Sequence, residues 1–433
     1  MKRFVTLLLI GLLVVAAGCI GSSSSGSSSS VQSGSSSSSG QQVKVIKLGA
    51  LLDLSGPIAS DGKKIQNALK LAQEDINAYF QKKGEPFKVE ILFEDTRTDP
   101  KVALEKLQTL DAQGVKVIIG PTSSGELKNM KSYVNAHKLI VISEASTAPP
   151  KFIGFAKPED KKYVFRFVPT DFFQSKAIAA ELKSKGIKGV VILYRGDAWG
   201  KGLHDATVEK IKGSIEIAED ISYPSNPEPT DWSPYISKAE QGVESLLSKY
   251  SPDQVAVWVV GFDEIATLLS QVSDDSPLLK VKWFGSDGDV LSDKIVEEAG
   301  DKASKVVLYS TQFFAQSEEG KKFVQRYREK FGIEPSEYAL IAYDAAWVGA
   351  LAEAEVLKEK GSFDADLVAQ KIKEILPKYS SGELGVSSVT GNIELDEWND
   401  RASGDYAIWG IVNGKWKLLG LWKSSTGRIE WSS

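Results

Sequence analysis

Residues 115–149 restrict the fold more than any other part of the sequence. They contain two short apolar runs, 115–119 and 139–142, separated by a segment whose apolar residues recur with helical spacing. Two apolar strands joined by one helix form a βαβ unit, in which the strands are parallel and the crossover is right-handed. Strand and helix continue to alternate on both sides, so the sequence predicts an α/β fold of doubly wound parallel sheets.

Small hydroxyl residues follow both of these strands. The first strand leads into Gly-Pro-Thr-Ser-Ser (residues 120–124) and the second into Ser-Glu-Ala-Ser-Thr (residues 143–147). The carboxyl ends of parallel strands open on one edge, where open α/β sheets bind ligands, and the N–H groups of a helix N-terminus attract anions. The pattern predicts a cradle for a small carboxylate. The alternative for any single Ser or Thr is an ordinary helix N-cap.

The N-terminal segment is typical of exported proteins. Residues 1–18 combine a basic start, an apolar run and small residues, which predicts a signal peptide. Cys19 is the only cysteine in the sequence, so no intrachain disulfide can form. Residues 16–19, Ala-Ala-Gly-Cys, resemble a lipobox with Ala16 in place of the usual leucine, which implies lipid attachment at Cys19. Ordinary cleavage that leaves a spare cysteine is the alternative.

Residues 19–42 are predicted to be a linker. Between positions 21 and 40 there are fourteen serines and four glycines, a composition that cannot bury a core. The chain from residue 43 onward is long enough to form two lobes. It is mildly acidic, with a formal charge of −5 for the whole sequence, which argues against a nucleic-acid-binding surface.

The sequence carries no recognisable catalytic or metal-binding motif. It has two histidines, no G-x-S-x-G elbow, no P-loop, and no G-x-G-x-x-G after the first strand. We therefore expect no catalytic residues, no metal and no cofactor. The strand–helix alternation restarts after residue 169, and the strand ends of this second lobe offer Trp199, Phe262 and Asp287. A hairpin is predicted at Asn413-Gly414, and its tryptophans either pack on a lobe or form a sugar platform.

The folded part is similar to the branched-chain amino-acid-binding family of ABC-transporter substrate-binding proteins, which have the type I periplasmic fold. The motifs that carry the resemblance are residues 49–57, Asp95 with Asp99-Pro100, and residues 117–124, 145–147, 198–202, 285–288 and 343–345. The resemblance implies two lobes joined by a three-segment hinge, with crossings near Val168, Thr311 and Ile393. Lobe 1 would comprise residues 43–168 plus 312–392, and lobe 2 residues 169–311 plus 393–433.

The resemblance also implies that an amino acid binds between the lobes. Its carboxylate would meet Ser124 and Thr147, and its ammonium would meet Asp287. A zwitterion that contacts both lobes binds the closed state better and shifts the population toward closure. The implied ligand-binding residues are Ser124, Ala145, Ser146, Thr147, Trp199, Phe262, Asp287 and Asp61.

Asp61 departs from the family pattern, because branched-chain binders have an aromatic residue there. A carboxylate that lines an aliphatic pocket is costly to bury. Either Asp61 is a solvated loop residue, or the side chain of the ligand is polar or cationic.

The sequence thus predicts a monomeric solute-binding lipoprotein on the outer face of the cytoplasmic membrane. It would capture an amino acid, branched-chain or related, and deliver it to the permease subunits of an ABC importer. The alternatives are a binding protein for a polar or cationic amino acid, an amide or another small solute, and a ligand-sensing ectodomain of a signalling complex.

Overall fold

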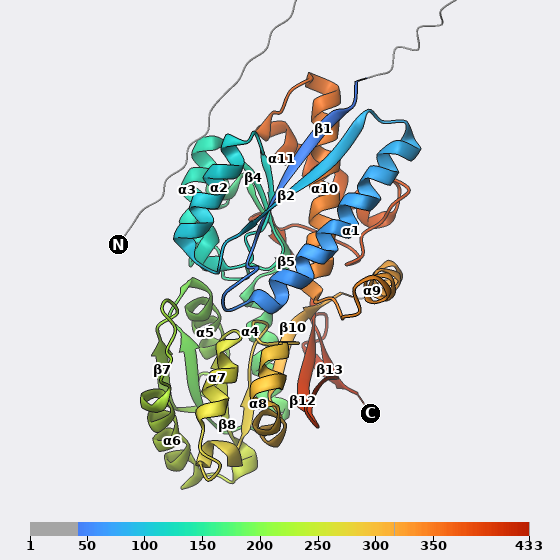
Figure 1. The fold of residues 1–433 in the computed structure, drawn as a ribbon. Coiled ribbons are helices and arrows are strands. Elements are labelled where there is room, and N and C mark those ends of the chain that lie inside the picture. The colour runs from blue at the N-terminus through green and yellow to red at the C-terminus, as the bar shows by residue number, and fades with distance from the viewer. Residues whose placement is uncertain (1–41, 316, 433) are drawn as a thin grey trace, which may run out of the picture. The chain divides into compact units, whose positions relative to one another are not determined.

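The structure, a computed structural model, describes residues 42–315 and 317–432. Its ribbon contains two sheets with helices on their faces (Figure 1). One sheet has the strand order β11-β5-β4-β3-β1-β2, and the other has the order β14-β13-β12-β10-β9-β8-β6-β7. The predicted α/β fold with two lobes is confirmed. The predicted signal peptide, Cys19 and almost all of the linker lie outside the described residues.

The first lobe is built on the six-stranded sheet. Its strands are β1 (Lys44–Leu52), β2 (Phe87–Asp95), β3 (Val117–Ile119), β4 (Ile140–Ser143), β5 (Val164–Pro169) and β11 (Asp400–Arg401). All pairings in this sheet are parallel. Its helices are α1 (Ala59–Lys83), α2 (Pro100–Ala112), α3 (Ser124–His137), α9 (Glu318–Phe331), α10 (Glu337–Lys360), α11 (Ala365–Ser381) and the short 3₁₀ helix η1 (Pro158–Lys161).

The second lobe is built on the eight-stranded sheet. Its strands are β6 (Gly189–Arg195), β7 (Glu216–Tyr223), β8 (Val255–Val260), β9 (Lys282–Phe284), β10 (Tyr309–Phe314), β12 (Asp405–Val412), β13 (Lys415–Lys423) and β14 (Arg428–Trp431). Its helices are α4 (Asp171–Ser184), α5 (Ala198–Ile211), α6 (Ser233–Leu247), α7 (Glu264–Gln271), α8 (Asp293–Val306), and the 3₁₀ helices η2 (Pro252–Gln254) and η3 (Pro277–Lys280). Strands β6 to β10 are parallel, whereas β12, β13 and β14 add an antiparallel edge.

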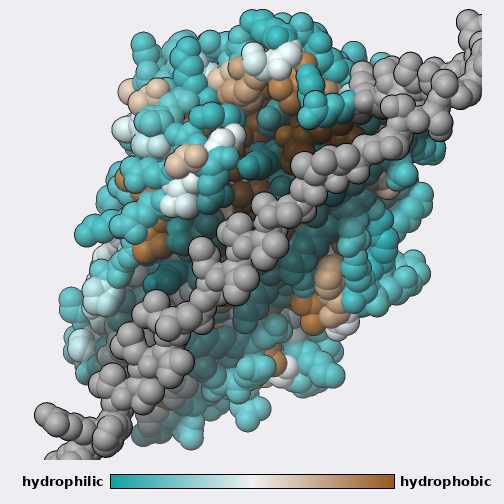
Figure 2. Space-filling model, turned by 45° about the horizontal axis from the view of Figure 1, so that its top comes forward, coloured by the Kyte–Doolittle hydropathy of each residue, from teal (hydrophilic) through white to brown (hydrophobic). Residues whose placement is uncertain are grey.

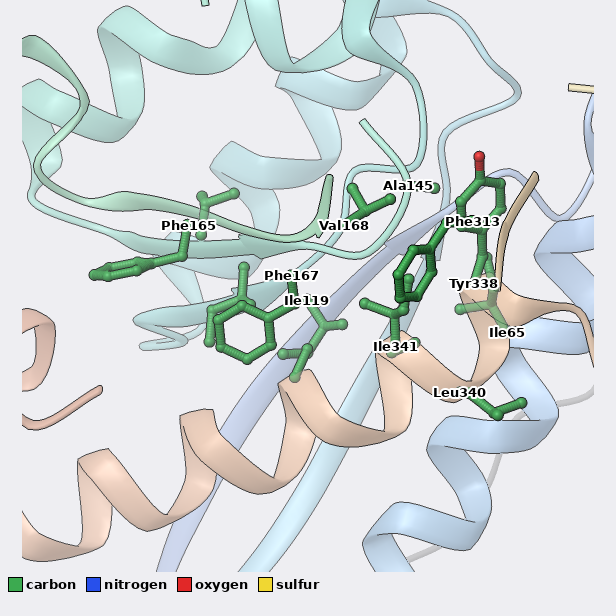
Figure 3. Close-up of a cluster of buried hydrophobic side chains, with 14 of the residues drawn as sticks. Ile65, Ile119, Ala145, Phe165, Phe167, Val168, Phe313, Tyr338, Leu340 and Ile341 are labelled. Carbon is green, nitrogen blue, oxygen red and sulfur yellow. The ribbon is translucent and has the colours of Figure 1, made fainter. Parts of the chain in front are cut away.

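The central strands are apolar on both faces because helices cover both sides of each sheet. Every residue of β8, Val-Ala-Val-Trp-Val-Val, is buried. Figure 3 shows side chains from four elements of the first lobe in one buried cluster, among them Ile65, Ile119, Phe165 and Ile341. The face shown in Figure 2 is mainly hydrophilic, as expected when the apolar side chains lie in the core. Among the described helices, none has the length and apolar character that a membrane span requires.

Both sheets reverse their strand order at one point, which places the ligand-binding edge. In the first sheet β2 lies on one side of β1 and β3 on the other, and in the second sheet β7 and β8 lie on opposite sides of β6. The loops after these strands therefore diverge at the carboxyl edge, where open α/β sheets bind ligands.

The chain passes between the two sheets three times, and two of the crossings come later than the resemblance implied. Strand β10 stays paired with β12 as far as Phe314, beyond the crossing placed near Thr311. Strand β11 pairs with β5, so the chain is still on the first sheet at Arg401, beyond Ile393. Short segments that add to a sheet edge leave little periodic signal in the sequence.

Three local features of the structure can be compared with the sequence. Asp99 caps α2, because its carboxylate accepts hydrogen bonds from the N–H groups of Lys101 and Val102. Strands β12 and β13 form the predicted hairpin, in which Trp422 is buried and packs on the lobe. Helix α1 begins at Ala59, so Asp61 lies in its first turn and the alternative of a solvated loop residue does not hold.

Candidate functional site

A cleft lies where residues of the first lobe meet residues of the second, and it is nearly closed, with a cavity volume of about 20 Å³. Six of the eight residues proposed from the sequence line it, and five further residues complete the wall. The full lining is Ile58, Asp61, Thr122, Ser123, Ser124, Ala145, Trp199, Phe262, Asp287, Gly288 and Tyr338. Ser146 and Thr147 are buried but do not line the cleft.

The wall contributed by the first lobe is formed by the start of α3 and the loop after β4. Ser123 is the N-cap of α3 and forms a capping box with Glu126, so the N-cap alternative applies to Ser123 and not to Ser124. The Ser124 hydroxyl lies 3.0 Å from the Ser146 hydroxyl and accepts a hydrogen bond from the N–H of Ala148. The wall thus presents a hydroxyl group and the N-terminus of a helix, which together suit an anion.

Thr147 lies behind this wall, next to an acidic residue that the sequence analysis missed. The N–H of Asp171 donates a 2.8 Å hydrogen bond to the Thr147 carbonyl oxygen. The Thr147 hydroxyl oxygen and both carboxylate oxygens of Asp171 are buried without a hydrogen-bond partner among the described residues. Burial raises the pKa of Asp171 well above its usual range, and the nearby Asp287 raises it further. The surroundings of Asp171 thus disfavour its charged form.

A buried ion cluster supports the loop after β4. Arg166 of β5 donates from its guanidinium to the carbonyl oxygens of Ser146 (3.0 Å) and Ala148 (2.6 Å). The same guanidinium forms a bidentate pair with Asp400 of β11, with both N–O distances at 2.6 Å. The ammonium of Lys161 lies 2.7 Å from Asp400. Because all three side chains are buried, their charges hold the loop in one conformation.

Two stacked aromatic rings form the wall contributed by the second lobe. The ring centroids of Trp199 and Phe262 lie 4.5 Å apart, and the two rings are nearly parallel, with an angle of 10° between their planes. The Arg195 guanidinium covers Phe262 at 4.1 Å, and it is itself paired with Asp197 and Glu264. A Cβ atom on Gly288 would lie 2.7 Å from the Trp199 ring, so only glycine allows this close approach.

Asp287 completes this wall and is oriented by a tyrosine from the other lobe. The Tyr338 hydroxyl, at the start of α10, donates to Oδ2 of Asp287, whereas Oδ1 is buried without a partner among the described residues. Figure 3 shows the Tyr338 hydroxyl directed away from the apolar cluster. Burial raises the pKa of Asp287 to about 6, although the hydrogen bond from Tyr338 acts in the opposite direction. The carboxylate is thus mostly ionised at neutral pH and has one oxygen free for a cation.

Further polar contacts connect the two lobes beside the cleft. The N–H of Asp263 donates to the Pro57 carbonyl oxygen at 3.1 Å, and the Ser60 hydroxyl donates to the Asp263 carboxylate at 2.9 Å. The Lys64 ammonium donates to the Leu291 carbonyl oxygen at 2.9 Å. These contacts, together with Tyr338–Asp287, join both lobes and indicate a closed arrangement.

Tyr338 and Asp171 were missed for different reasons. Asp171 follows β5, so the strand-end argument that found Ser124 also applies to it. Tyr338 lies in a helix far along the chain, and no sequence pattern places that helix at the cleft. Within residues 42–315 and 317–432, no group of His, Cys, Asp or Glu side chains has the arrangement needed to hold a metal ion.

Buried carboxyl groups predict an unusual dependence of stability on pH. Burial raises the pKa of Glu144, Glu181, Glu337 and Glu353 from 4.5 to about 8. A carboxyl group whose pKa is raised by folding stabilises the protein below its unfolded pKa, and this contribution is lost as the pH rises through the folded value. We expect the free energy of unfolding, measured by urea denaturation without ligand, to be higher at pH 5.5 than at pH 8.5.

Two variants of α10, one at a buried and one at an exposed glutamate, test this expectation. Glu353→Gln removes a buried carboxyl group on α10 away from the cleft and should reduce the difference between the two pH values. Glu355→Gln removes a neighbouring carboxylate that pairs with Lys358 at the surface and should leave the difference unchanged. Equal or greater stability of the unmodified protein at pH 8.5 would contradict the prediction.

Comparisons of the sequence and of the structure with known proteins both find binding proteins. A family model described as periplasmic binding protein matches residues 45–415. An uncharacterized protein of Methanocaldococcus jannaschii is 48% identical over 394 residues, covering 90% of this chain and 93% of the relative. A Leu/Ile/Val-binding protein homolog of Brucella abortus is 26% identical over 375 residues, covering 86% and 90%.

A solved structure shares the fold. The branched-chain amino acid transporter substrate binding protein of Streptococcus pneumoniae, in complex with isoleucine, superposes with a TM-score of 0.70. The sequence identity is 22%, and the match covers 90% of this chain and all of that chain.

Proposed function

The chain belongs to the periplasmic binding protein family, and from this premise we propose that it captures an amino acid in its cleft for delivery to an ABC importer. The family consists of substrate-binding proteins rather than enzymes, and the Brucella abortus relative is named for binding leucine, isoleucine and valine. The Streptococcus pneumoniae structure contains isoleucine.

One observation supports an amino acid more than any other solute: one wall of the cleft suits a negatively charged group, and the other suits a positively charged group. Ser124 and the N-terminus of α3 suit a carboxylate, whereas the free oxygen of Asp287 on the other lobe suits an ammonium group. An α-amino acid carries both groups on one carbon and can bridge the lobes. A ligand that bridges the lobes stabilises the closed arrangement, which a permease can distinguish from the open one.

The proposed function includes export and anchoring. The sequence of residues 1–18 and the position of Cys19 support a lipid-anchored protein on the outer face of the cytoplasmic membrane. The protein would act there as a monomer and would contact the permease subunits of the importer.

Thermal unfolding with each amino acid tests the ligand class. A ligand at 100 times its Kd adds about 2.7 kcal/mol to the free energy of unfolding, which raises the midpoint measurably. Ser124→Ala should weaken binding of the amino acid that gives the rise by about 10-fold or more, because a hydrogen bond to a charged group is lost. Ser317→Ala, which removes the N-cap of α9 away from the cleft, should leave the affinity unchanged. If no amino acid raises the midpoint, the proposed function is wrong.

A further inference from the structure

Asp61 is fixed at the cleft by close packing at the start of α1. It lies in the first turn of the helix and lines the cleft, so it is not the solvated loop residue that the sequence left open. A Cβ atom on Gly62 would lie 1.9 Å from the Asp53 carbonyl oxygen, because α1 touches the end of β1 here. Only glycine permits this contact, and Asp61 is held next to it.

The Asp61 carboxylate has a buried oxygen that accepts no hydrogen bond from the part of the chain that the structure describes. Oδ1 is buried without a hydrogen-bond partner among the described residues. Burial raises the pKa of Asp61, whereas the nearby Lys64 ammonium, which donates to the Leu291 carbonyl oxygen, and the Ser336 hydroxyl act in the opposite direction. A buried acceptor without a partner costs about 1–3 kcal/mol, and more when it is charged. Such a group calls for a partner, which a water, an ion or a ligand can supply.

The cleft is lined by more carboxyl groups than an amino acid with an uncharged side chain can pair. The lining contains two carboxyl groups, Asp61 and Asp287, and no lysine, arginine or histidine. Leucine, isoleucine and valine each carry one ammonium group, which the free oxygen of Asp287 would bind. With such a ligand, closure of the cleft would leave Asp61 unpaired in an environment of low polarity.

The remaining walls suit a cation at the end of an apolar chain. Trp199, Phe262 and Tyr338 line the space, and the faces of Phe262 are already covered by Trp199 and the Arg195 guanidinium. Aromatic faces attract ammonium and guanidinium groups and also pack against methylene groups. The cleft thus combines a surface for an aliphatic stem with an acceptor for a nitrogen at its end.

From the free Asp61 oxygen and these aromatic walls we infer that the ligand is a basic amino acid, whose side-chain nitrogen donates to Asp61 while its α-ammonium group binds Asp287. This inference rests on the proposed function, because it assumes that an α-amino acid occupies the cleft.

Calorimetric titration with L-lysine, L-arginine and L-norleucine tests the inference. Norleucine has the carbon chain of lysine without the terminal nitrogen, so it isolates the contribution of that group. We expect the protein to bind lysine or arginine about 10- to 100-fold more tightly than norleucine, as for a hydrogen bond to a charged group. Asp61→Asn should reduce this preference about 10-fold or more, with the unfolding midpoint recorded to show that the variant is folded. Glu74→Gln, which removes an exposed carboxylate on the same helix, should keep the preference.

The possible outcomes separate the two proposals. Tight binding of leucine, isoleucine or norleucine, with no preference for lysine or arginine, would overturn the inference and leave the proposed function intact. An unchanged preference in folded Asp61→Asn would also overturn it. Failure of every amino acid to bind would overturn both.

Discussion

Replacing Asp400 with alanine is expected to lower the free energy of unfolding by about 3–5 kcal/mol, the largest effect on stability that we predict for one substitution. Removing one partner of a buried ion pair leaves an uncompensated charge. Here two buried cations, Arg166 and Lys161, would lose their shared carboxylate. Burial alone would raise the pKa of Asp400, but Arg166 and Lys161 outweigh it and hold the pKa below its usual range.

Urea denaturation at pH 7 measures this effect. Asp400→Asn keeps the size of the side chain but not its charge, so it should also be strongly destabilising. Glu74→Ala removes one partner of the exposed Lys330 pair and should change the free energy of unfolding by less than about 1 kcal/mol. A loss below about 1 kcal/mol for Asp400→Ala would show that the ion cluster does not stabilise the fold. Because Arg166 also holds the carbonyl oxygens of the loop after β4, the variant should weaken ligand binding as well.

The second large effect concerns affinity. Asp287→Asn should raise the Kd of the bound amino acid about 30-fold or more, because losing one partner of a buried charge pair typically costs 2–5 kcal/mol. Asparagine has nearly the same shape and can still accept the hydrogen bond from Tyr338, so the loss would report mainly on the charge. Asp301→Asn, a substitution at an exposed position of α8, should leave the Kd unchanged.

The affinity should also depend on pH through the same residue. Because the pKa of Asp287 is about 6 without ligand, its carboxylate becomes protonated below that value and loses its attraction for an ammonium group. We expect the affinity to be constant above pH 7 and to fall by up to tenfold per unit below pH 6. The Asp287→Asn variant should lack this fall, and a retained fall would assign it to another group.

Much of this architecture could be predicted because it depends on local patterns. The apolar runs of β1, β3, β4 and β8 are nearly continuous, as expected for strands buried on both faces. Asp99-Pro100 marks the start of α2, and Asn413-Gly414 marks the terminal hairpin, since each has a defined local geometry. The strand-end rule brought Ser124, Trp199 and Asp287 to one cleft.

The rest depends on contacts between distant segments. Tyr338 reaches Asp287 because α10 packs beside α1 and β1, which no spacing in the sequence specifies. A loop position for Asp61 was left open because α1 begins with small and polar residues, yet its first turn is fixed by contact with β1. Strand β11 is two residues long, too short for any periodicity to appear.

The position of β11 has a consequence for biosynthesis. The first lobe lacks an edge strand, and Arg166 lacks its counter-ion, until residue 400 has left the ribosome. Helix α10, which packs on the first sheet, is also made only after five strands of the second lobe. Neither lobe can therefore complete its fold until most of the chain, as far as residue 400 and beyond, has been synthesised.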